Sequence, residues 1–354
     1  MKIALVLPGS IWYSPYVQIY IRILDVLNKD YSIISWNREG DDKPEGFQYN
    51  VPCPSGHSSA SWKAYRGYIK FIKKTINEQG FERIIVFGPQ MTCMLSPFLL
   101  MHFRGRYMID YRDMSIEQKY GFKQLFALML KFSRVNVISS PGFRRRLPKR
   151  DYYLSHNFDV NAVKEAITET ISGAFDTESV IEVLTIGAIR DLSSNIEVVK
   201  ALANKNDVKL SFVGKGMAAE QIAKYCEEEG IKNVSFTGFY QKEEEATYVK
   251  NTTFMNIFYP RIITHDTALS NRFYNSLIYK KPMIVTKNTL QGDYVDNNHL
   301  GIAIVDCENL SDELERFIAS EDFVRYAERC NDLLRRFLRD QELFENAIET
   351  FVRE

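Results

Sequence analysis

Cysteine is scarce in this chain of 354 residues, and the few that occur lack the spacing of a structural motif. The five thiols stand far apart without a Cys-x-x-Cys pair: Cys53, Cys93, Cys226, Cys307 and Cys330. Their odd number and wide spacing argue against a disulfide framework and against a zinc site. We therefore expect a protein of the reducing cytoplasm.

Long hydrophobic runs are missing as well. The run that opens the chain, residues 1–7, has the length of a strand, ends at Pro8 and Gly9, and is too short for the core of a signal peptide. No later segment approaches the roughly 18 apolar residues that a membrane-spanning helix needs. The sequence predicts a protein that is neither exported nor membrane-spanning.

Net charge is the third absence, because 45 lysines and arginines balance 45 aspartates and glutamates. This balance argues against a highly charged disordered chain and against a general polyanion binder. It hides an asymmetry, since residues 1–155 hold 23 basic and 12 acidic side chains while residues 156–354 hold 22 and 33. The two parts carry net charges of +11 and −11, and we expect them to meet different partners.

Two series of strand-length apolar runs alternate with helix-length segments, as in parallel sheets that are buried on both faces. The first series lies at 2–8, 31–36, 83–88, 106–111 and 135–140, and the second at 181–187, 208–214, 233–238, 253–258 and 282–287. Helices are expected at 195–204, 217–230 and 272–281, with one or two amphipathic helices from about 321 to 354.

The predicted fold class is therefore α/β, with two Rossmann-like doubly wound domains that face each other across a cleft. We place an N-terminal domain at 1–160, a C-terminal domain at 161–325, and a C-terminal helix at 326–354 that returns toward the N-terminal domain. Such sheets bind ligands at the carboxyl ends of their strands. The turns at those ends are the first places to search.

Two turns of the second domain contain features suited to a phosphate. Gly214-Lys215-Gly216 joins a strand to a helix, but the next strand ends in Thr237-Gly238 without a carboxylate, which disfavours NAD. The remaining readings are a turn whose amides face a phosphate, or a purely structural turn. Arg190 follows the preceding strand beside a helix whose N-cap we expect at Ser193 or Ser194, and it either grips phosphate oxygens or pairs with Asp191 at the surface.

A later helix begins near Ser270 and places Asn271 and Asn275 four residues apart on one face. These two amides can bind a pair of sugar hydroxyls, or they are a cap and a solvated face. His57 and His265 stand alone, and we assign neither as a catalytic base.

Several segments, taken in their order along the chain, resemble the nucleotide-binding domain of GT-B fold glycosyltransferases. The resemblance is greatest to the family 4 type of bacterial capsular and exopolysaccharide clusters. The segments are GAIR (187–190), VGKG (213–216), FTGFY (236–240), ALSNRFYNSLIYKKPMIV (268–285), GDYV (292–295) and LGIAI (300–304). In the first half, the turn at 8–10, the strand end DYRD (110–113) and SHNFD (155–159) are similar to that family's N-lobe loop, strand end and marker before the linker. The resemblance spans the chain.

The resemblance implies an enzyme that moves a sugar from a nucleotide-diphosphate sugar to a glycan or lipid-linked saccharide in surface polysaccharide synthesis, with retention of configuration. The family's Glu-x7-Glu element falls on Thr267 and Asn275, which are not acidic, and the lysine that usually follows the GxxR turn is missing. Three explanations stay open: Asn275 holds the ribose as a neutral group, the donor differs, or this copy is impaired.

Donor binding without a metal is expected, because the chain contains no Asp-x-Asp. Arg190 and Lys215 then clamp the diphosphate together with amides near 266–268, while Phe239 or Tyr240 lies against the base or in the core. We expect no cofactor. The full set of expected donor-binding residues is Gly9, Ser10, Gly187, Arg190, Lys215, Gly216, Phe239, Tyr240, Asp266, Thr267, Ala268, Asn271 and Asn275.

On the acceptor side, Asp110, Arg112 and Asp113 end a strand, where a carboxylate can orient an acceptor hydroxyl. With Arg190 they are the expected catalytic residues. The alternative interpretation of the same residues is a structural Arg–Asp ion pair. The basic run Arg144, Arg145, Arg146, Lys149 and Arg150 is either a solvated loop or a contact with anionic lipid headgroups, each cation contributing about 1 kcal/mol near a membrane surface.

Nucleic acid is not an expected partner, because no binding module is recognised and the second domain is acidic. We expect a cytoplasmic protein, with peripheral association with the inner face of the plasma membrane through the basic run. Two alternatives from other classes stay open: a nucleotide-sugar epimerase of the same fold, and a non-catalytic relative that binds nucleotide sugars.

Overall fold

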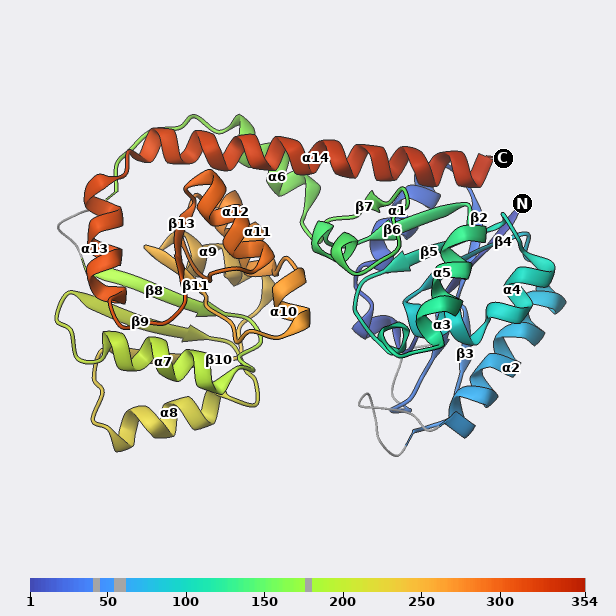
Figure 1. Cartoon of the computed structure of the whole chain (residues 1–354), viewed down its shortest axis with the longest axis horizontal. Helices are drawn as coiled ribbons and strands as arrows, with labels where there is room; N and C mark the ends of the chain where they lie inside the picture. The colour runs from blue at the N-terminus through green and yellow to red at the C-terminus, as the bar shows by residue number, and fades with distance from the viewer. Residues whose placement is uncertain (41–44, 54–61, 176–179, 354) are drawn as a thin grey trace. The chain divides into compact units, whose positions relative to one another are not determined.

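The computed structural model describes residues 1–40, 45–53, 62–175 and 180–353, and His57 lies outside these ranges. The chain divides into two compact units (Figure 1). Unit 1 comprises Met1–His156 and Asp340–Glu354, and unit 2 comprises Asn157–Arg339. This division assigns residues 157–160 and 326–339 to unit 2, outside the domain limits expected from the sequence. Within the described ranges, no helix is long and apolar enough to cross a membrane.

Unit 1 is built on a parallel sheet of seven strands. Their order across the sheet is β3 (Phe47–Tyr49), β2 (Asp30–Trp36), β1 (Lys2–Val6), β4 (Arg83–Phe87), β5 (Tyr107–Tyr111), β6 (Val135–Ile138) and β7 (Tyr153–Leu154). All five strands predicted for this half are present. The two additional strands, β3 and β7, are only three and two residues long and lie at the sheet edges.

Successive side chains of a strand point to opposite sides of the sheet, and in unit 1 each side packs in its own apolar core. Ile3 and Leu5 of β1 pack with α1 (Val17–Val26) and with Phe344 and Phe351 of α14 (Phe323–Arg353). Ala4 and Val6 share the other core with α2 (Trp62–Gln79), α3 (Pro89–Met94), α4 (Ser96–His102) and α5 (Phe122–Phe132). The end of the C-terminal helix therefore packs on the first domain, as predicted.

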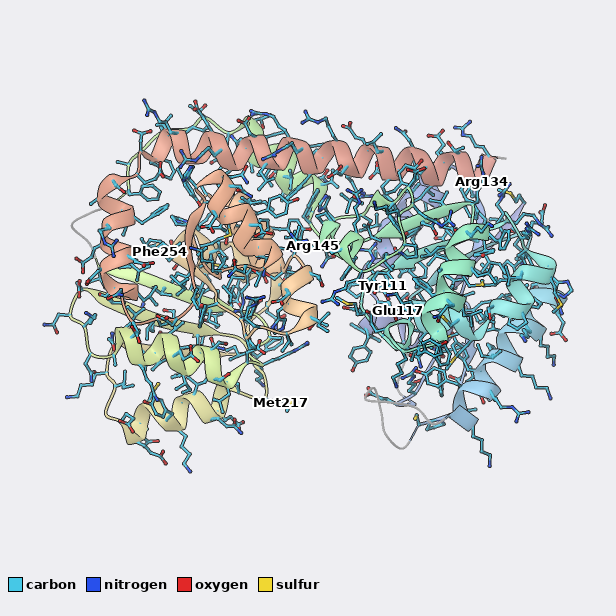
Figure 2. All side chains as sticks on the ribbon, in the orientation of Figure 1. Tyr111, Glu117, Arg134, Arg145, Met217 and Phe254 are labelled. Atoms are coloured by element: carbon cyan, nitrogen blue, oxygen red, sulfur yellow. The ribbon has the colours of Figure 1, made fainter. Side chains whose placement is uncertain are left out.

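Unit 2 contains a second parallel sheet, of six strands. The order is β10 (Val234–Gly238), β9 (Val208–Val213), β8 (Ile181–Ile186), β11 (Phe254–Ile257), β12 (Met283–Thr286) and β13 (Gly301–Ile304). One face packs against α7 (Leu192–Leu202), α8 (Ala219–Glu228) and α13 (Leu310–Ser320), and Phe254, labelled in Figure 2, is fully buried in that core. The other packs against α6 (Val160–Thr168), α9 (Glu245–Lys250), α11 (Asn271–Ile278), α12 (Leu290–Asn298) and the first part of α14.

The strand order reverses at one place in each sheet, between β1 and β4 in unit 1 and between β8 and β11 in unit 2. In doubly wound sheets, connections on the two sides of such a point leave in opposite directions and open a crevice at the carboxyl ends of the strands. The segments that follow β8, β9, β10 and β11 are therefore the ones to examine in unit 2. In unit 1, they are the segments after β1, β4 and β5.

Candidate functional site

The turns after β8 and β9 pack backbone against backbone. A Cβ added at Gly214, whose φ is +131°, would lie 2.0 Å from the carbonyl oxygen of Gly187, and one at Gly216 would lie 2.0 Å from that of Ile189. The amide of Ile189 donates to the carbonyl of Lys215 at 3.1 Å, joining the two turns. The glycines thus have the structural role that the sequence left open, and they place the residues of the two turns side by side.

Two exposed cations stand on these turns. Arg190 is exposed and makes no ion pair or hydrogen bond with any residue in the described part of the chain, so the alternative of a pair with Asp191 is not seen. Lys215 is exposed too, with its ammonium 5.8 Å from the ring centre of Phe239, while Met217 beside it projects into solvent (Figure 2). Cations without carboxylate partners are available to an anion.

The expected N-cap of the following helix is wrong. The residue that caps α7 is Asp191, and its side chain makes no capping hydrogen bond. Ser194 instead lies inside the first turn, where its side chain is buried.

A hydrogen-bonded cluster joins three elements at the same edge of the sheet. Tyr240, which follows β10, donates from its hydroxyl to Oε2 of Glu245 at 2.6 Å, and Asn275 of α11 donates from Nδ2 to Oε1 at 2.8 Å. Lys242 is also bonded to Oε1. An added Cβ at Gly187 would lie 4.0 Å from the hydroxyl of Tyr240, which places the cluster next to the β8 turn.

This cluster fixes the orientation of Asn275. An ionised carboxylate only accepts hydrogen bonds, so the NH2 group of the amide must face Glu245 and Oδ1 must face away from it. Burial acts to raise the pKa of Glu245, but the hydrogen bonds from Lys242, Tyr240 and Asn275 outweigh it and lower that pKa, which keeps the carboxylate charged. The hydrogen bond therefore leaves Oδ1 of Asn275 as an acceptor on the side away from Glu245.

Sequence reasoning missed Glu245. It ends the acidic run Glu243-Glu244-Glu245, which reads as a solvated surface. The nearest signal is Lys242 three residues earlier, yet only the tertiary fold shows that Glu245 turns toward α11.

Arg272 is a second residue that the sequence did not single out. It is a buried guanidinium whose three nitrogens donate to the carbonyls of Ile186, Asn256 and Ala188 at 2.5, 3.1 and 3.2 Å. These carbonyls belong to the ends of β8 and β11 and to the turn that carries Arg190. Arg272 therefore ties α11 to the point where the strand order reverses.

The segment 266–268 requires a correction. It belongs to the short helix α10 (Ile263–Thr267), in which the amides of Asp266 and Ala268 already donate to the carbonyls of Ile262 and Thr264 at 2.8 and 3.1 Å. Asp266 is paired with Arg261, and Thr267 is buried with its hydroxyl donating to the Ile263 carbonyl at 2.8 Å. These amides are not free for a diphosphate, contrary to expectation.

The start of α11 has the capping role that the sequence allowed. Ser270 is the N-cap and accepts from the amide of Phe273, and Asn271 accepts from Nδ2 of Asn157 at 2.7 Å. Asn271 is exposed. Of the two asparagines predicted to share a face, only Asn275 is held by the carboxylate cluster.

The strand end of β5 forms a buried structural pair in unit 1. Arg112 donates from Nε and Nη2 to the two carboxylate oxygens of Asp110, both at 2.8 Å, and from Nη2 to the Ser155 hydroxyl. The hydroxyl of Tyr20 donates to Asp110 as well. Asp110 has no exposed surface, which supports the alternative of an Arg–Asp structural pair. Its expected role toward an acceptor stays a prediction.

Known structures share this architecture across the whole chain. Sucrose-phosphate synthase from Thermosynechococcus elongatus matches with a TM-score of 0.68 and 12% identity over 100% of both chains. The lipopolysaccharide outer core galactosyltransferase WaaB matches with 0.68 and 14% over 99% of both, and Anabaena HepE in complex with UDP with 0.66 and 11% over 99% of this chain and 100% of that one. The chain has the GT-B fold.

A less similar structure is a UDP-N-acetylglucosamine 2-epimerase from Rickettsia bellii, with a TM-score of 0.57 and 10% identity over 98% of both chains. No family model and no curated protein matches the sequence. At these identities the likeness shows the GT-B fold and nothing finer.

The other expected site residues of unit 1 differ in how far they are exposed. Asp113 is exposed, and its surroundings still raise its pKa through desolvation, against the lowering effect of Arg112. Ser10 is buried as the N-cap of η1 (Ile11–Tyr13), and the carbonyl of Gly9 accepts from the Trp36 amide. Tyr111 points to the opposite side of β5 from Asp110, where it donates to buried Glu117 at 2.7 Å (Figure 2).

The basic run lies at the surface of unit 1. All five cations are exposed: Arg144, Arg145, Arg146, Lys149 and Arg150. Arg144 donates to the Tyr152 carbonyl at 3.1 Å, and the first part of the run folds as the short helix η3 (Pro141–Arg145). Exposure is compatible with both readings of this segment, a solvated loop and a lipid contact.

Proposed function

We propose that this protein is a glycosyltransferase that moves a sugar from a nucleotide-diphosphate sugar to a glycan or lipid-linked saccharide. The observation that carries the proposal is the fixed Oδ1 of Asn275 at the same sheet edge as the cations Arg190 and Lys215. The first group suits a ribose hydroxyl and the other two suit a diphosphate. The nucleotide would therefore lie across the carboxyl ends of β8 and β9.

Sugar transfer needs stabilisation of the diphosphate that leaves. Fixed cations supply this without a metal, because their charge is in place before the bond to the sugar breaks. Arg190 offers a planar fork that matches two phosphate oxygens, and Lys215 offers a point charge on the neighbouring turn. We propose a metal-independent reaction with retention of configuration, in which Arg190 acts on the leaving diphosphate. Asp113 of unit 1 is proposed to act on the acceptor.

The binding of uridine nucleotides by structural neighbours supports the choice of donor. HepE has been solved with UDP, with UDP and glucose, and with UDP-glucose. WaaB is a lipopolysaccharide galactosyltransferase, which supports a place in surface polysaccharide synthesis. We further propose that the protein works in the cytoplasm, at the inner face of the plasma membrane, where its basic run meets anionic lipid.

A screen of nucleotide sugars tests this proposal. The full chain would be titrated by calorimetry with UDP, GDP, ADP and CMP and their sugar conjugates, and hydrolysis of each conjugate followed by mass spectrometry. We expect one base to bind clearly better than the others, with slow hydrolysis of its sugar conjugate. Absence of binding and hydrolysis across the whole panel would overturn the assignment, and binding without turnover would indicate a non-catalytic relative.

An epimerase is the second candidate, favoured by the similarity to the Rickettsia bellii enzyme. The two activities differ in their need for an acceptor. Incubation with the preferred nucleotide sugar alone, analysed by NMR, separates them, because an epimerised nucleotide sugar forms without acceptor only in the second case.

A further inference from the structure

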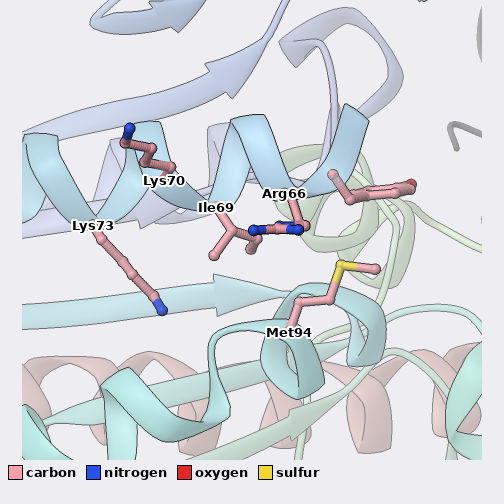
Figure 3. A pocket seen from close by; sticks show the side chains of 6 residues that line it. Arg66, Ile69, Lys70, Lys73 and Met94 are labelled. Atoms are coloured by element: carbon pink, nitrogen blue, oxygen red, sulfur yellow. The ribbon is translucent and has the colours of Figure 1, made fainter. Parts of the chain in front are cut away.

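Unit 1 holds a cavity of about 420 Å³ that none of the expected site residues lines. It lies between one side of α2 and the end of α3, as Figure 3 shows. Its lining residues are Tyr65, Arg66, Ile69, Lys70 and Lys73 from α2 and Met94 from α3. The volume falls in the range of about 300 to 1,000 Å³ that small-molecule sites occupy.

Helix α2 is strongly divided between an apolar face and a cationic one. Tyr68, Ile72 and Ile76 point into the core of unit 1. Lysine or arginine recurs at 63, 66, 70 and 73, a spacing of three and four residues that keeps these side chains on one side of the helix. The cavity lies along the border between the two faces, so that its wall is apolar and its rim is positive.

The rim cations are not neutralised by neighbours. Arg66 and Lys70 are exposed and form no ion pair or hydrogen bond with other described residues, and Lys73 lies 5.8 Å from the ring centre of Phe98. The one ion pair that α2 makes in the described chain joins Lys74 to Glu78 at 3.7 Å, outside the cavity. The positive charge at the cavity is therefore available to a ligand.

A buried arginine, Arg38, adds positive charge next to the cavity residue Tyr65. Arg38 is 7% exposed and donates from Nη2 to the carbonyl of Pro8 and to the hydroxyl of Tyr65, the residue that lines the cavity. Its guanidinium lies 4.4 Å from the ring centre of Trp36, and its buried Nε has no hydrogen-bond partner among the described residues. A buried cation whose contacts in the described chain are neutral raises the positive potential of its surroundings.

The cavity also lies near the edge of the sheet where doubly wound domains bind ligands. Helix α3 begins directly after β4, through Gly88, so that Met94 lies just beyond the carboxyl end of a central strand. Helix α2 leads from the β3 side back to the start of β4, and the cavity residues occupy its first two thirds.

We propose that this cavity binds the phosphate head of a membrane-borne amphiphile. Arg66, Lys70 and Lys73 hold the phosphate, and the first part of the hydrocarbon chain lies against Tyr65, Ile69 and Met94. A free phosphate would leave the apolar wall without a contact, and a neutral glycan would leave the three cations without an anion. The inference rests on the proposed function in one respect, which is that the amphiphile is the lipid part of the acceptor.

Binding of dodecyl phosphate to the full chain, below its micelle concentration, tests the proposal by calorimetry. Inorganic phosphate and dodecyl maltoside are the two comparison probes. We expect dodecyl phosphate to bind at least tenfold more tightly than either. Equal binding of inorganic phosphate would show a simple anion site, and equal binding of dodecyl maltoside a plain apolar groove, and each result would overturn the proposal.

Matched variants on α2 locate the site. Lys70→Gln combined with Lys73→Gln is expected to weaken dodecyl phosphate binding about tenfold or more, while Lys74→Gln, outside the cavity, changes it less than twofold. An equal loss in the Lys74→Gln variant would mean that only the overall charge of α2 matters, and the proposal would be abandoned.

Binding of UDP to the same preparations separates this proposal from the proposed function. We expect UDP affinity to be the same in the wild type, in the Lys70→Gln/Lys73→Gln double variant and in Lys74→Gln. If UDP binds and dodecyl phosphate does not, the cavity proposal alone fails. If dodecyl phosphate binds with the expected variant pattern and no nucleotide binds, the glycosyltransferase assignment alone fails.

Discussion

Asn275 on α11 donates its amide proton to Glu245 on α9 across 2.8 Å, so that a neutral side chain is held by a carboxylate from another helix. In the glycosyltransferases that the sequence resembles, the position of Asn275 is a glutamate. A glutamate there would face Glu245, and two carboxylates at hydrogen-bonding distance resist joint ionisation. The neutral residue at 275 and the acidic residue at 245 are therefore parts of one arrangement.

The first prediction concerns this pair. Asn275→Glu should weaken UDP binding about tenfold, since two adjacent carboxylates either repel each other or take up a proton that blocks the acceptor atom. Adding Glu245→Gln to that variant should restore most of the affinity, because the new carboxylate then accepts from an amide. Calorimetry on the two single variants and the double variant measures the coupling. Additive losses in the double variant would contradict the arrangement.

The second prediction concerns the diphosphate. Arg190→Ala should weaken UDP binding about 10- to 100-fold, as expected for loss of charge-assisted hydrogen bonds of about 1.5 to 3 kcal/mol. Uridine, which lacks the phosphates, should bind the variant and the wild type alike. Arg145→Ala is the control, since Arg145 lies in unit 1 on the basic run, and its UDP affinity should stay within twofold. An unchanged affinity in Arg190→Ala would refute the diphosphate assignment.

The third prediction concerns the contact of the two glycine turns. Gly214→Ala should destabilise unit 2 by about 2 to 4 kcal/mol, because the new methyl group meets the Gly187 carbonyl at a φ of +131°. Gly230→Ala is the matched control, as Gly230 has a φ of +64° with open space around its Cβ position, and it should cost about 1 kcal/mol. Urea unfolding followed by circular dichroism measures both. Similar losses in the two variants would mean that backbone strain alone, and not the turn contact, requires Gly214.

The fold was predictable because long parallel strands buried on both faces leave continuous apolar runs in the sequence. Each of the ten predicted runs contains a strand. The short edge strands β3, β7 and β13 are not among the ten, because a strand that pairs on one side only needs few apolar residues. The division between His156 and Asn157 depends on packing partners rather than on composition, and it differs by four residues from the limit expected at 160.

The candidate site was predictable only where local chemistry marks it. Arg190 and Lys215 follow strands at glycine turns, a pattern visible in one dimension. Glu245 and Arg272 have roles that depend on which way a helix face turns in the folded unit, and neither neighbouring sequence nor residue type indicates this. The cavity on α2 was not predicted for the same reason, because its lining residues come from two helices that only the fold brings together.

The fourth prediction concerns the buried pair on β5. Asp110→Ala should cost about 3 to 5 kcal/mol of folding free energy, because Arg112 would keep its charge inside unit 1 without its carboxylate partner. Asp113→Asn, three residues away and exposed, should change stability by less than about 0.5 kcal/mol. Urea unfolding of both variants checks this. An Asp110→Ala protein as stable as the wild type would contradict the structural role of the Asp110–Arg112 pair.

The fifth prediction concerns pH and a buried histidine. His156 is 1% exposed with Nε2 3.2 Å from Oδ2 of Asp340, and burial lowers its pKa below the ordinary 6.5 although Asp340 opposes the shift. The unfolded chain then binds the proton first, so stability is complete above about pH 6.5 and declines as the pH falls from there toward the folded-state pKa. His156→Asn should show a smaller loss of unfolding free energy between pH 7 and 5 than the wild type. His102→Asn, at an exposed position, should match the wild-type slope, and an unaltered slope in His156→Asn would show that the titration of this histidine is not the source of the acid sensitivity.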